Sequence, residues 1–271
     1  MLSSLGAALA DLVLPSACAG CAAERVPLRF GACADCVTAL AALTPFRAVP
    51  VPPPRGLPAC VAAGPYGAAL RGMLLAYKEK GRHRLARPLG ALLAGAVAEL
   101  APDRSRPVLL VPVPSTAAAV RERHGDHMAR LATQTVRRLR AAGWQADAIQ
   151  PLSAAPRPDS ASLDASARAA FAENSLRIRP GRIRVLRRES TMRRTLVVVD
   201  DIVTTGATLA AVASRLGEAD VQVNGAAVLA ATQLRRARQA GPAGSPDRFA
   251  GLPPRGSGRA VRHQIGSPNE G

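Results

Sequence analysis

The feature that most constrains the fold is the stretch LVVVDDIVTTGAT at residues 196–208. An apolar run ends in two adjacent carboxylates, Asp200 and Asp201, and a loop of small and hydroxylated residues follows. The run predicts a buried strand at 195–200, and the spacing after the loop predicts a helix at 207–217. A buried strand that passes through a tight loop into a helix is typical of the βαβ units of a parallel α/β sheet.

The same alternation of strands and helices extends over most of the chain. We expect helices at 85–100 and 117–141, and strands at 107–114, 144–150 and 221–230. These elements predict the α/β fold class, with a mostly parallel sheet.

Composition divides the chain into four parts. Residues 1–48 hold a short N-terminal helix and a four-cysteine module, and the proline-rich stretch at 49–60 predicts a linker. Residues 61–236 carry the strand and helix pattern. Residues 237–271 are rich in Gly, Pro, Ser and Arg and predict a disordered basic tail.

The two carboxylates predict a binding site at the carboxyl edge of the sheet, where ligands of parallel α/β proteins bind. Asp200 and Asp201 suit vicinal sugar hydroxyls, either directly or through a divalent cation. The backbone N–H groups of the following turn, at the start of a helix, suit a phosphate. A ribose 5-phosphate combines both groups. The alternative is that the two acids only cap the helix.

Four cysteines form two CxxC pairs, Cys18 with Cys21 and Cys33 with Cys36. Two such turns can close a tetrahedral zinc site of the structural kind, which supports the fold and carries out no chemistry. Disulfides are the alternative, and they fit poorly in a reducing cytosol. The fifth cysteine, Cys60, stands alone, and we expect it to be a small buried residue.

The stretch at 196–208 resembles the phosphoribosyl pyrophosphate (PRPP) motif of type I phosphoribosyltransferases. The order of the four-cysteine cluster, YGAALRGMLLAYKEKGR at 66–82, LLVPVP at 109–114 and this motif resembles the ComF family. The resemblance covers roughly residues 10–231. It implies a Rossmann-like phosphoribosyltransferase core behind a zinc finger, Mg²⁺ bound with PRPP, and a link to DNA uptake in competent bacteria.

Position by position, the resemblance implies that Asp200 and Asp201 hold the ribose hydroxyls. It implies a 5-phosphate loop formed by Thr204, Thr205, Gly206, Ala207 and Thr208. It places the pyrophosphate loop at Val113, Pro114 and Ser115. It also matches Lys78 to a family lysine near the phosphates, the alternative being an ordinary surface lysine.

The chain departs from the family pattern in the segments that would contact the leaving group and the acceptor. The family often has Arg-Gly-Phe-Asn-Gln after the pyrophosphate loop, and this chain has Arg-His-Gly-Asp-His at 123–127. Phe171 follows Arg168 by three residues, where the family has Asn. His124 and His127 either contact pyrophosphate or transfer protons, or they are solvated residues of a mobile loop. The acceptor chemistry is therefore open.

The net charge of +17 comes almost entirely from arginine. Such a surface attracts polyanions, among them nucleic acid, although an arginine-rich proteome would give the same composition. The N-terminus lacks the basic residues of a signal peptide, and Asp11 interrupts its apolar run. No stretch approaches the roughly 20 apolar residues of a membrane span, so we expect a cytoplasmic protein.

Two functions of different kinds fit these patterns. The first is an enzyme that binds PRPP with Mg²⁺ and transfers the phosphoribosyl group to a nitrogen acceptor. The second is an accessory factor of DNA uptake or nucleotide sensing that binds nucleic acid or DNA-uptake proteins. The segment at 177–194, with eight arginines, favours the second if it is a phosphate-binding surface; the alternative is a solvated hairpin.

Overall fold

The computed structural model describes residues 17–155, 175–190 and 194–232. Contacts place Met1–Leu234 in one compact unit, and the second unit, Arg235–Gly271, lies outside the described residues. The helix predicted near the N-terminus, the tail at 237–271 and the position of Phe171 also lie outside them. The predicted division into four parts stays a prediction.

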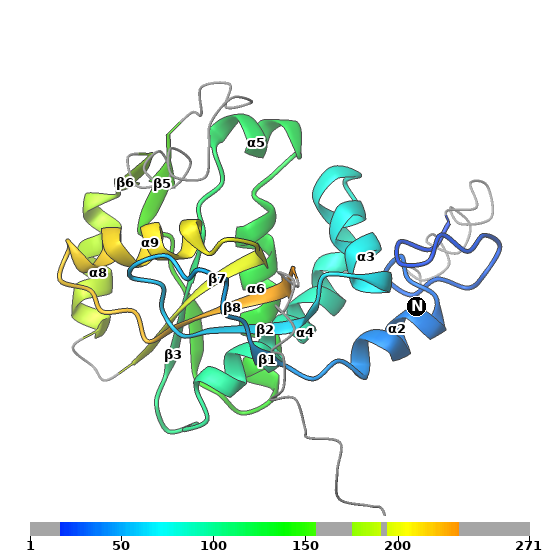
Figure 1. Cartoon of the computed structure of the whole chain (residues 1–271), viewed down its shortest axis with the longest axis horizontal. Helices are drawn as coiled ribbons and strands as arrows, with labels where there is room; N and C mark the ends of the chain where they lie inside the picture. The colour runs from blue at the N-terminus through cyan, green and yellow to red at the C-terminus, as the bar shows by residue number, and fades with distance from the viewer. Residues whose placement is uncertain (1–16, 156–174, 191–193, 233–271) are drawn as a thin grey trace, which may run out of the picture. The chain divides into compact units, whose positions relative to one another are not determined.

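A six-stranded sheet forms the centre of the described unit (Figure 1). Its order is β1-β2-β8-β7-β3-β4, and every neighbouring pair is parallel except β1 with β2. The strands are β1 (Phe46–Arg47), β2 (Cys60–Pro65), β3 (Val108–Pro112), β4 (Ala146–Ala148), β7 (Thr195–Val203) and β8 (Gly225–Ala231). A separate antiparallel pair consists of β5 (Leu152–Ala154) and β6 (Leu176–Ile178). The predicted α/β fold with a mostly parallel sheet is confirmed.

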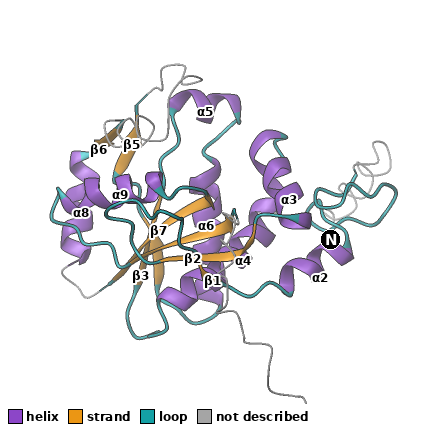
Figure 2. Ribbon diagram, viewed as in Figure 1, coloured by secondary structure: helices purple, strands orange, loops and turns teal. Residues whose placement is uncertain are grey.

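Helices cover both faces of this sheet, as Figure 2 shows by secondary structure. The side chains of α3 (Ala68–Glu79), α4 (Ala86–Leu100) and α6 (His127–Ala141) pack into a first core, and those of α8 (Pro180–Ser190) and α9 (Ala207–Gly217) into a second. Strand residues alternate between the two cores: Val197 and Val199 face the first, and Leu196 and Val198 face the second. The remaining helical segments are α2 (Ala34–Ala41), η1 (His83–Leu85) and α5 (Ala117–Glu122).

The helix predicted at 117–141 is in fact two helices, α5 and α6. The break lies at 123–126, where His124 and Gly125 have positive φ angles of 53° and 135°. Asp126 then caps α6, because its side chain accepts a hydrogen bond from the backbone N–H of Ala129 at 3.0 Å. The helical periodicity continues across the break, which explains why the sequence pattern did not reveal it.

The proline-rich stretch runs between β1 and β2 on the side of the second core. Leu57 packs against that core, and the N–H of Ala48 donates to the carbonyl oxygen of Cys60 at 2.9 Å. Predicted strands and helices otherwise occur where expected, with shifted ends: β7 continues to Val203, and β8 begins only at Gly225.

Candidate functional site

The strand order places a crevice between the carboxyl ends of β3 and β7. From β3 the chain continues through α5 and α6 to β4 on one side. From β7, which pairs with the other side of β3, it continues through α9 to β8. The helices that follow the two strands therefore cover opposite faces of the sheet. Such a topological switch point is where open α/β sheets bind their ligands.

A pocket of about 310 Å³ lies at this crevice. Seven residues of the predicted site line it: Lys78, Val113, Pro114, Ser115, Asp200, Asp201 and Thr208. The structure thus brings together the loop after β3, the end of β7 and one residue of α3. Four other predicted residues, Thr204, Thr205, Gly206 and Ala207, do not line the pocket and lie in the adjoining turn.

That turn leads directly into α9. Gly206 occupies the N-cap of α9 with φ of 76°, a left-handed conformation that favours glycine. Thr204 and Thr205 are exposed, and the N–H of Ala207 donates to the hydroxyl of Thr205 at 3.4 Å. A Cβ at Gly206 would lie 3.0 Å from Leu57, so the proline-rich stretch packs directly on this turn.

The two carboxylates have different environments, because adjacent residues of a strand point to opposite faces. Asp201 is only 6% exposed, and its Oδ2 lies 2.6 Å from Nζ of Lys78 and 3.4 Å from Nε2 of His127. Asp200 is half-buried, and its Oδ1 accepts a hydrogen bond from the N–H of Asp201 at 2.8 Å. Lys78 is therefore the ion-pair partner of a buried acid and not an ordinary surface lysine.

These contacts separate the pKa values of the pair. Burial and the neighbouring charge of Asp201 raise the pKa of Asp200 to about 8. Burial opposes the ionised form of Asp201 too, but the hydrogen bond from His127 and the ion pair with Lys78 lower its pKa to about 2. Asp201 therefore carries the negative charge, and Asp200 is the member of the pair that holds a proton near neutral pH.

His127 occupies the centre of a polar network. It is 6% exposed, and its Nδ1 lies 3.5 Å from Oγ of Ser115. Oγ of Ser115 is also 3.5 Å from Oδ1 of Asp126, and the side-chain amide of Gln150 donates to Oδ2 of Asp126 at 2.8 Å. The expectation of two solvated histidines is therefore wrong for His127, whereas His124 is exposed.

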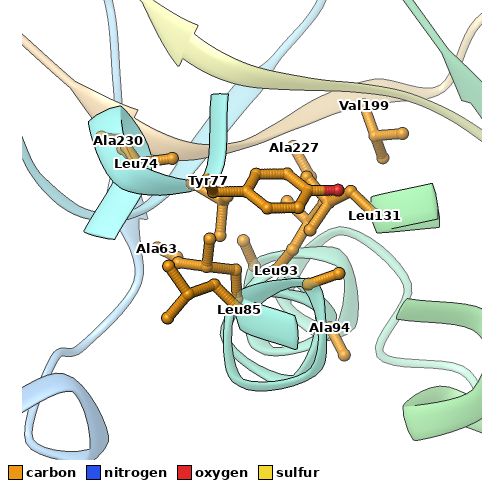
Figure 3. Close-up of a cluster of buried hydrophobic side chains, with 14 of the residues drawn as sticks. Ala63, Leu74, Tyr77, Leu85, Leu93, Ala94, Leu131, Val199, Ala227 and Ala230 are labelled. Carbon is orange, nitrogen blue, oxygen red and sulfur yellow. The ribbon is translucent and has the colours of Figure 1, made fainter. Parts of the chain in front are cut away.

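The backbone of His127 is fixed from α3 as well. The hydroxyl of Tyr77 donates to the carbonyl oxygen of His127 at 2.6 Å. Figure 3 shows the Tyr77 ring among Leu74, Leu93 and Leu131 in the first core. Tyr77, Asp126 and Gln150 were not predicted as site residues. Tyr77 lies in the family-like stretch at 66–82 and Asp126 in the departing segment at 123–127. Neither pattern indicated the contacts of these side chains, and Gln150 gave no signal.

The far wall of the pocket comes from the small antiparallel sheet. It is lined by Ala154 of β5, Leu176 of β6 and Ser175 just before β6, together with Arg123. A β-bridge between Thr116 and Ala154 joins this sheet to the loop after β3. This wall is partly apolar.

The four cysteines of the two CxxC pairs meet at one point. Their Sγ atoms all lie within 4.8 Å of one another. Cys33 caps α2, and its backbone N–H and that of Gly20 point to Sγ of Cys18 at 3.3 and 3.4 Å. Burial would raise the pKa of Cys18, but backbone hydrogen bonds from Cys21, Cys33 and Gly20 lower it to about 6. The donor set fits a zinc ion, which thiolates bind in closed tetrahedral sites.

Cys60 stands apart from this cluster in the second core. It is 4% exposed, and burial raises the pKa of its thiol to about 12. It is a buried small residue of β2, as predicted.

The cysteine module packs on α3, the helix that carries Lys78. Gly72 contacts the turn at Ala19 and Gly20 so closely that a Cβ there would lie 2.6 Å from the oxygen of Ala19. The guanidinium of Arg82 donates to the carbonyl oxygen of Ala17 at 2.6 Å. The module therefore shares the first core with the sheet.

Comparison with known families agrees with this geometry. A family model described as a phosphoribosyl transferase domain matches residues 126–245. This range contains α6, β7 and the acid pair, and it supports a PRPP-binding, transferase-like function. Comparison with curated proteins found no match. In the part of the chain that the structure describes, no helix combines the length and apolar character of a membrane span.

Proposed function

We propose that the protein is a phosphoribosyltransferase that binds PRPP, or another ribose 5-phosphate ligand, with Mg²⁺ in the pocket between β3 and β7. The observation that carries the proposal is the meeting of three predicted parts at one switch point. The loop after β3, the acid pair of β7 and Thr208 of α9 line the pocket there, and the turn before α9 adjoins it. The resemblance to the ComF family names the same three parts.

Each part has a chemical role in this proposal. Asp200 and Asp201 form hydrogen bonds with the ribose hydroxyls. The turn from Thr204 to Thr208, at the N-terminus of α9, receives the 5-phosphate. Val113, Pro114 and Ser115 receive the pyrophosphate, and Lys78 neutralises Asp201 so that an anionic ligand can approach.

The reaction would break the bond between C1 of the ribose and the pyrophosphate oxygen and form a bond from C1 to the acceptor nitrogen. The electron pair of the broken bond leaves with pyrophosphate, and the nitrogen loses a proton. The protein acts by holding both reactants in line and by stabilising the charges, not by forming a covalent intermediate.

The pocket fits Mg²⁺ as a companion of the ligand. Magnesium in proteins is held largely by water and substrate phosphates, and Ser115, which this proposal assigns to the pyrophosphate, lines the pocket. When bound, Mg²⁺ neutralises charge on the leaving pyrophosphate. The zinc proposed for the four cysteines would instead be structural, because four thiolates leave no open position.

The accessory role in DNA uptake is not carried by a specific contact. The segment at 177–194 is not a hairpin; it contains the end of β6 and the helix α8. Arg187 donates to the carbonyl oxygen of Ala219 at 2.6 Å and pairs with Asp220, and Arg194 lies 3.8 Å from Asp147. Arg187 and Arg194 thus contact other parts of the fold, and Arg177, Arg179, Arg182, Arg184 and Arg188 are exposed. An exposed basic helix face is compatible with DNA but does not identify it as the partner.

Calorimetry with PRPP and Mg²⁺ tests the proposal. The double variant Asp200→Asn with Asp201→Asn should bind at least tenfold more weakly, because hydrogen bonds to charged groups contribute roughly 1.5–3 kcal/mol each. Asp147→Asn, an exposed change outside the pocket, is the matched control and should bind as the wild type does. Unchanged affinity in a folded double variant would overturn the assignment of the acids. If the wild type binds PRPP, a screen of free bases for pyrophosphate release identifies the acceptor.

A further inference from the structure

The ring of His127 contacts both sides of the pocket. Nε2 lies 3.4 Å from Oδ2 of Asp201 at the end of β7, and Nδ1 lies 3.5 Å from Oγ of Ser115 in the loop after β3. The other partner of Asp201 is Lys78, and the other partner of Ser115 is Asp126. The ring thus spans the crevice between the two strands.

The directions of these hydrogen bonds follow from chemistry. An ionised Asp201 can only accept, so the proton of a neutral imidazole must be on Nε2. Nδ1 is then an acceptor and faces the hydroxyl of Ser115 as donor. The two distances, 3.4 Å and 3.5 Å, are at the long end of the hydrogen-bond range.

The position of the ring is fixed independently of the ligand. The backbone of His127 receives the hydrogen bond from Tyr77, and Asp126 caps the helix that His127 begins. The surroundings of the ring include the cation Lys78 from α3, the carboxylates Asp201 from β7 and Asp126 from the preceding cap, and the hydroxyl of Tyr77. The ring is therefore a rigid bridge on a rigid element.

We infer that His127 is a positioning residue, which holds Asp201 and Ser115 in the one arrangement that binds the sugar and the pyrophosphate together. Lys78 and His127 both contact Oδ2 of Asp201 and neither uses Oδ1. Fixing Oδ2 in this way sets the rotamer of the carboxylate and directs Oδ1 as the acceptor for one ribose hydroxyl. The inference rests on the proposed function for the identity of the ligand.

This role separates His127 from a residue that merely fills space. A side chain that fills space could be replaced by any group of similar volume, whereas a positioning residue needs an N–H donor toward Asp201. Glutamine keeps an amide N–H donor and has a comparable length, and alanine removes the donor. His124, which is exposed in the same turn, offers a matched histidine without these contacts.

The first experiment measures PRPP affinity with Mg²⁺ by calorimetry. We expect His127→Ala to weaken binding roughly tenfold to a hundredfold, His127→Gln to remain within about threefold of the wild type, and His124→Ala to have no effect. Equal affinity of His127→Ala and the wild type would overturn the inference and leave the proposed function standing. Equal loss in the glutamine and alanine variants would also overturn it, because the donor would then not be what matters.

A second measurement needs no ligand. Long-range ¹H–¹⁵N NMR at pH 8 reports which ring nitrogen carries the proton, and we expect Nε2 for His127. We also expect the signal of this proton to move in Asp201→Asn and not in Asp147→Asn. A proton on Nδ1 alone would overturn the inference even if the wild type bound no PRPP, a result that would separately refute the proposed function.

Discussion

Replacing Gly72 by alanine should detach the cysteine module from α3. In an exposed helix interior this change stabilises by about 1 kcal/mol, because glycine is the poorer helix former. Here a Cβ would lie 2.6 Å from the carbonyl oxygen of Ala19 and would overlap that of Gly20 as well. Both are backbone atoms, so no side-chain rotation relieves the contact. Overpacking costs about 1–3 kcal/mol, so the net change is a destabilisation of up to about 2 kcal/mol.

Gly95 in α4 provides the matched control. The nearest atom to a Cβ built there is Cγ of Pro45 at 3.8 Å, an ordinary van der Waals contact. Gly95→Ala should therefore show the stabilisation of about 1 kcal/mol without the overlap. The two variants should differ by about 1–3 kcal/mol, which corresponds to roughly 2–12 °C in Tm for a protein of this size.

Thermal unfolding of the zinc-loaded protein and the rate of zinc release to a chelating dye give the two readouts. We expect Gly72→Ala to have the lower Tm and the faster release. A Gly72→Ala protein that gains stability as Gly95→Ala does, with unchanged zinc release, would refute the close docking of the module on α3. A lower Tm with unchanged release would place the damage in α3 and not at the cysteine turn.

Two further predictions concern the metal and the acid pair. Protein purified without metal affinity should contain about one zinc per chain, and a metal-free wild type would contradict this. The Cys33→Ser variant should lose the zinc. Its hydrogen exchange should increase at residues 17–45 while the sheet stays protected. Because the pKa of Asp200 is raised to about 8, the folded state keeps a proton that the unfolded state loses near pH 4, so the free energy of unfolding should fall as pH rises from about 4 to 8. Urea unfolding at pH 5 and 8 should show a smaller fall for Asp200→Asn, and an equal fall in both proteins would mean that another group causes it.

The fold could be predicted from local patterns because each strand and helix carries its own period. The run at 196–199 is apolar on both faces, as is typical of a strand buried between two layers of helices. The exact ends were less predictable. β7 continues past Asp200 because β8 pairs with it up to Val203. This pairing depends on the neighbouring strand and not on the local sequence of β7.

The candidate site was predictable where its residues are close in sequence. The acid pair and the turn after it form one continuous stretch, and the two CxxC turns are each local. The contacts between Lys78 and Asp201, and between Gln150 and Asp126, join residues from different elements. They exist only because the strand order brings those elements to one edge of the sheet, so no pattern within either element indicates them.

The charge of the pocket shows why such contacts matter for function. From the sequence, Asp200 and Asp201 are two negative charges placed against a ligand that is itself strongly negative. In the structure Lys78 pairs with Asp201, Asp200 holds a proton near neutral pH because its pKa is raised to about 8, and Arg123 lines the same pocket. In the proposed function the acids would then remain hydrogen-bonding groups for a sugar, while the pocket as a whole would not repel phosphate. The residues that compensate the acid pair come from other elements, Lys78 from α3 and Arg123 from the end of α5.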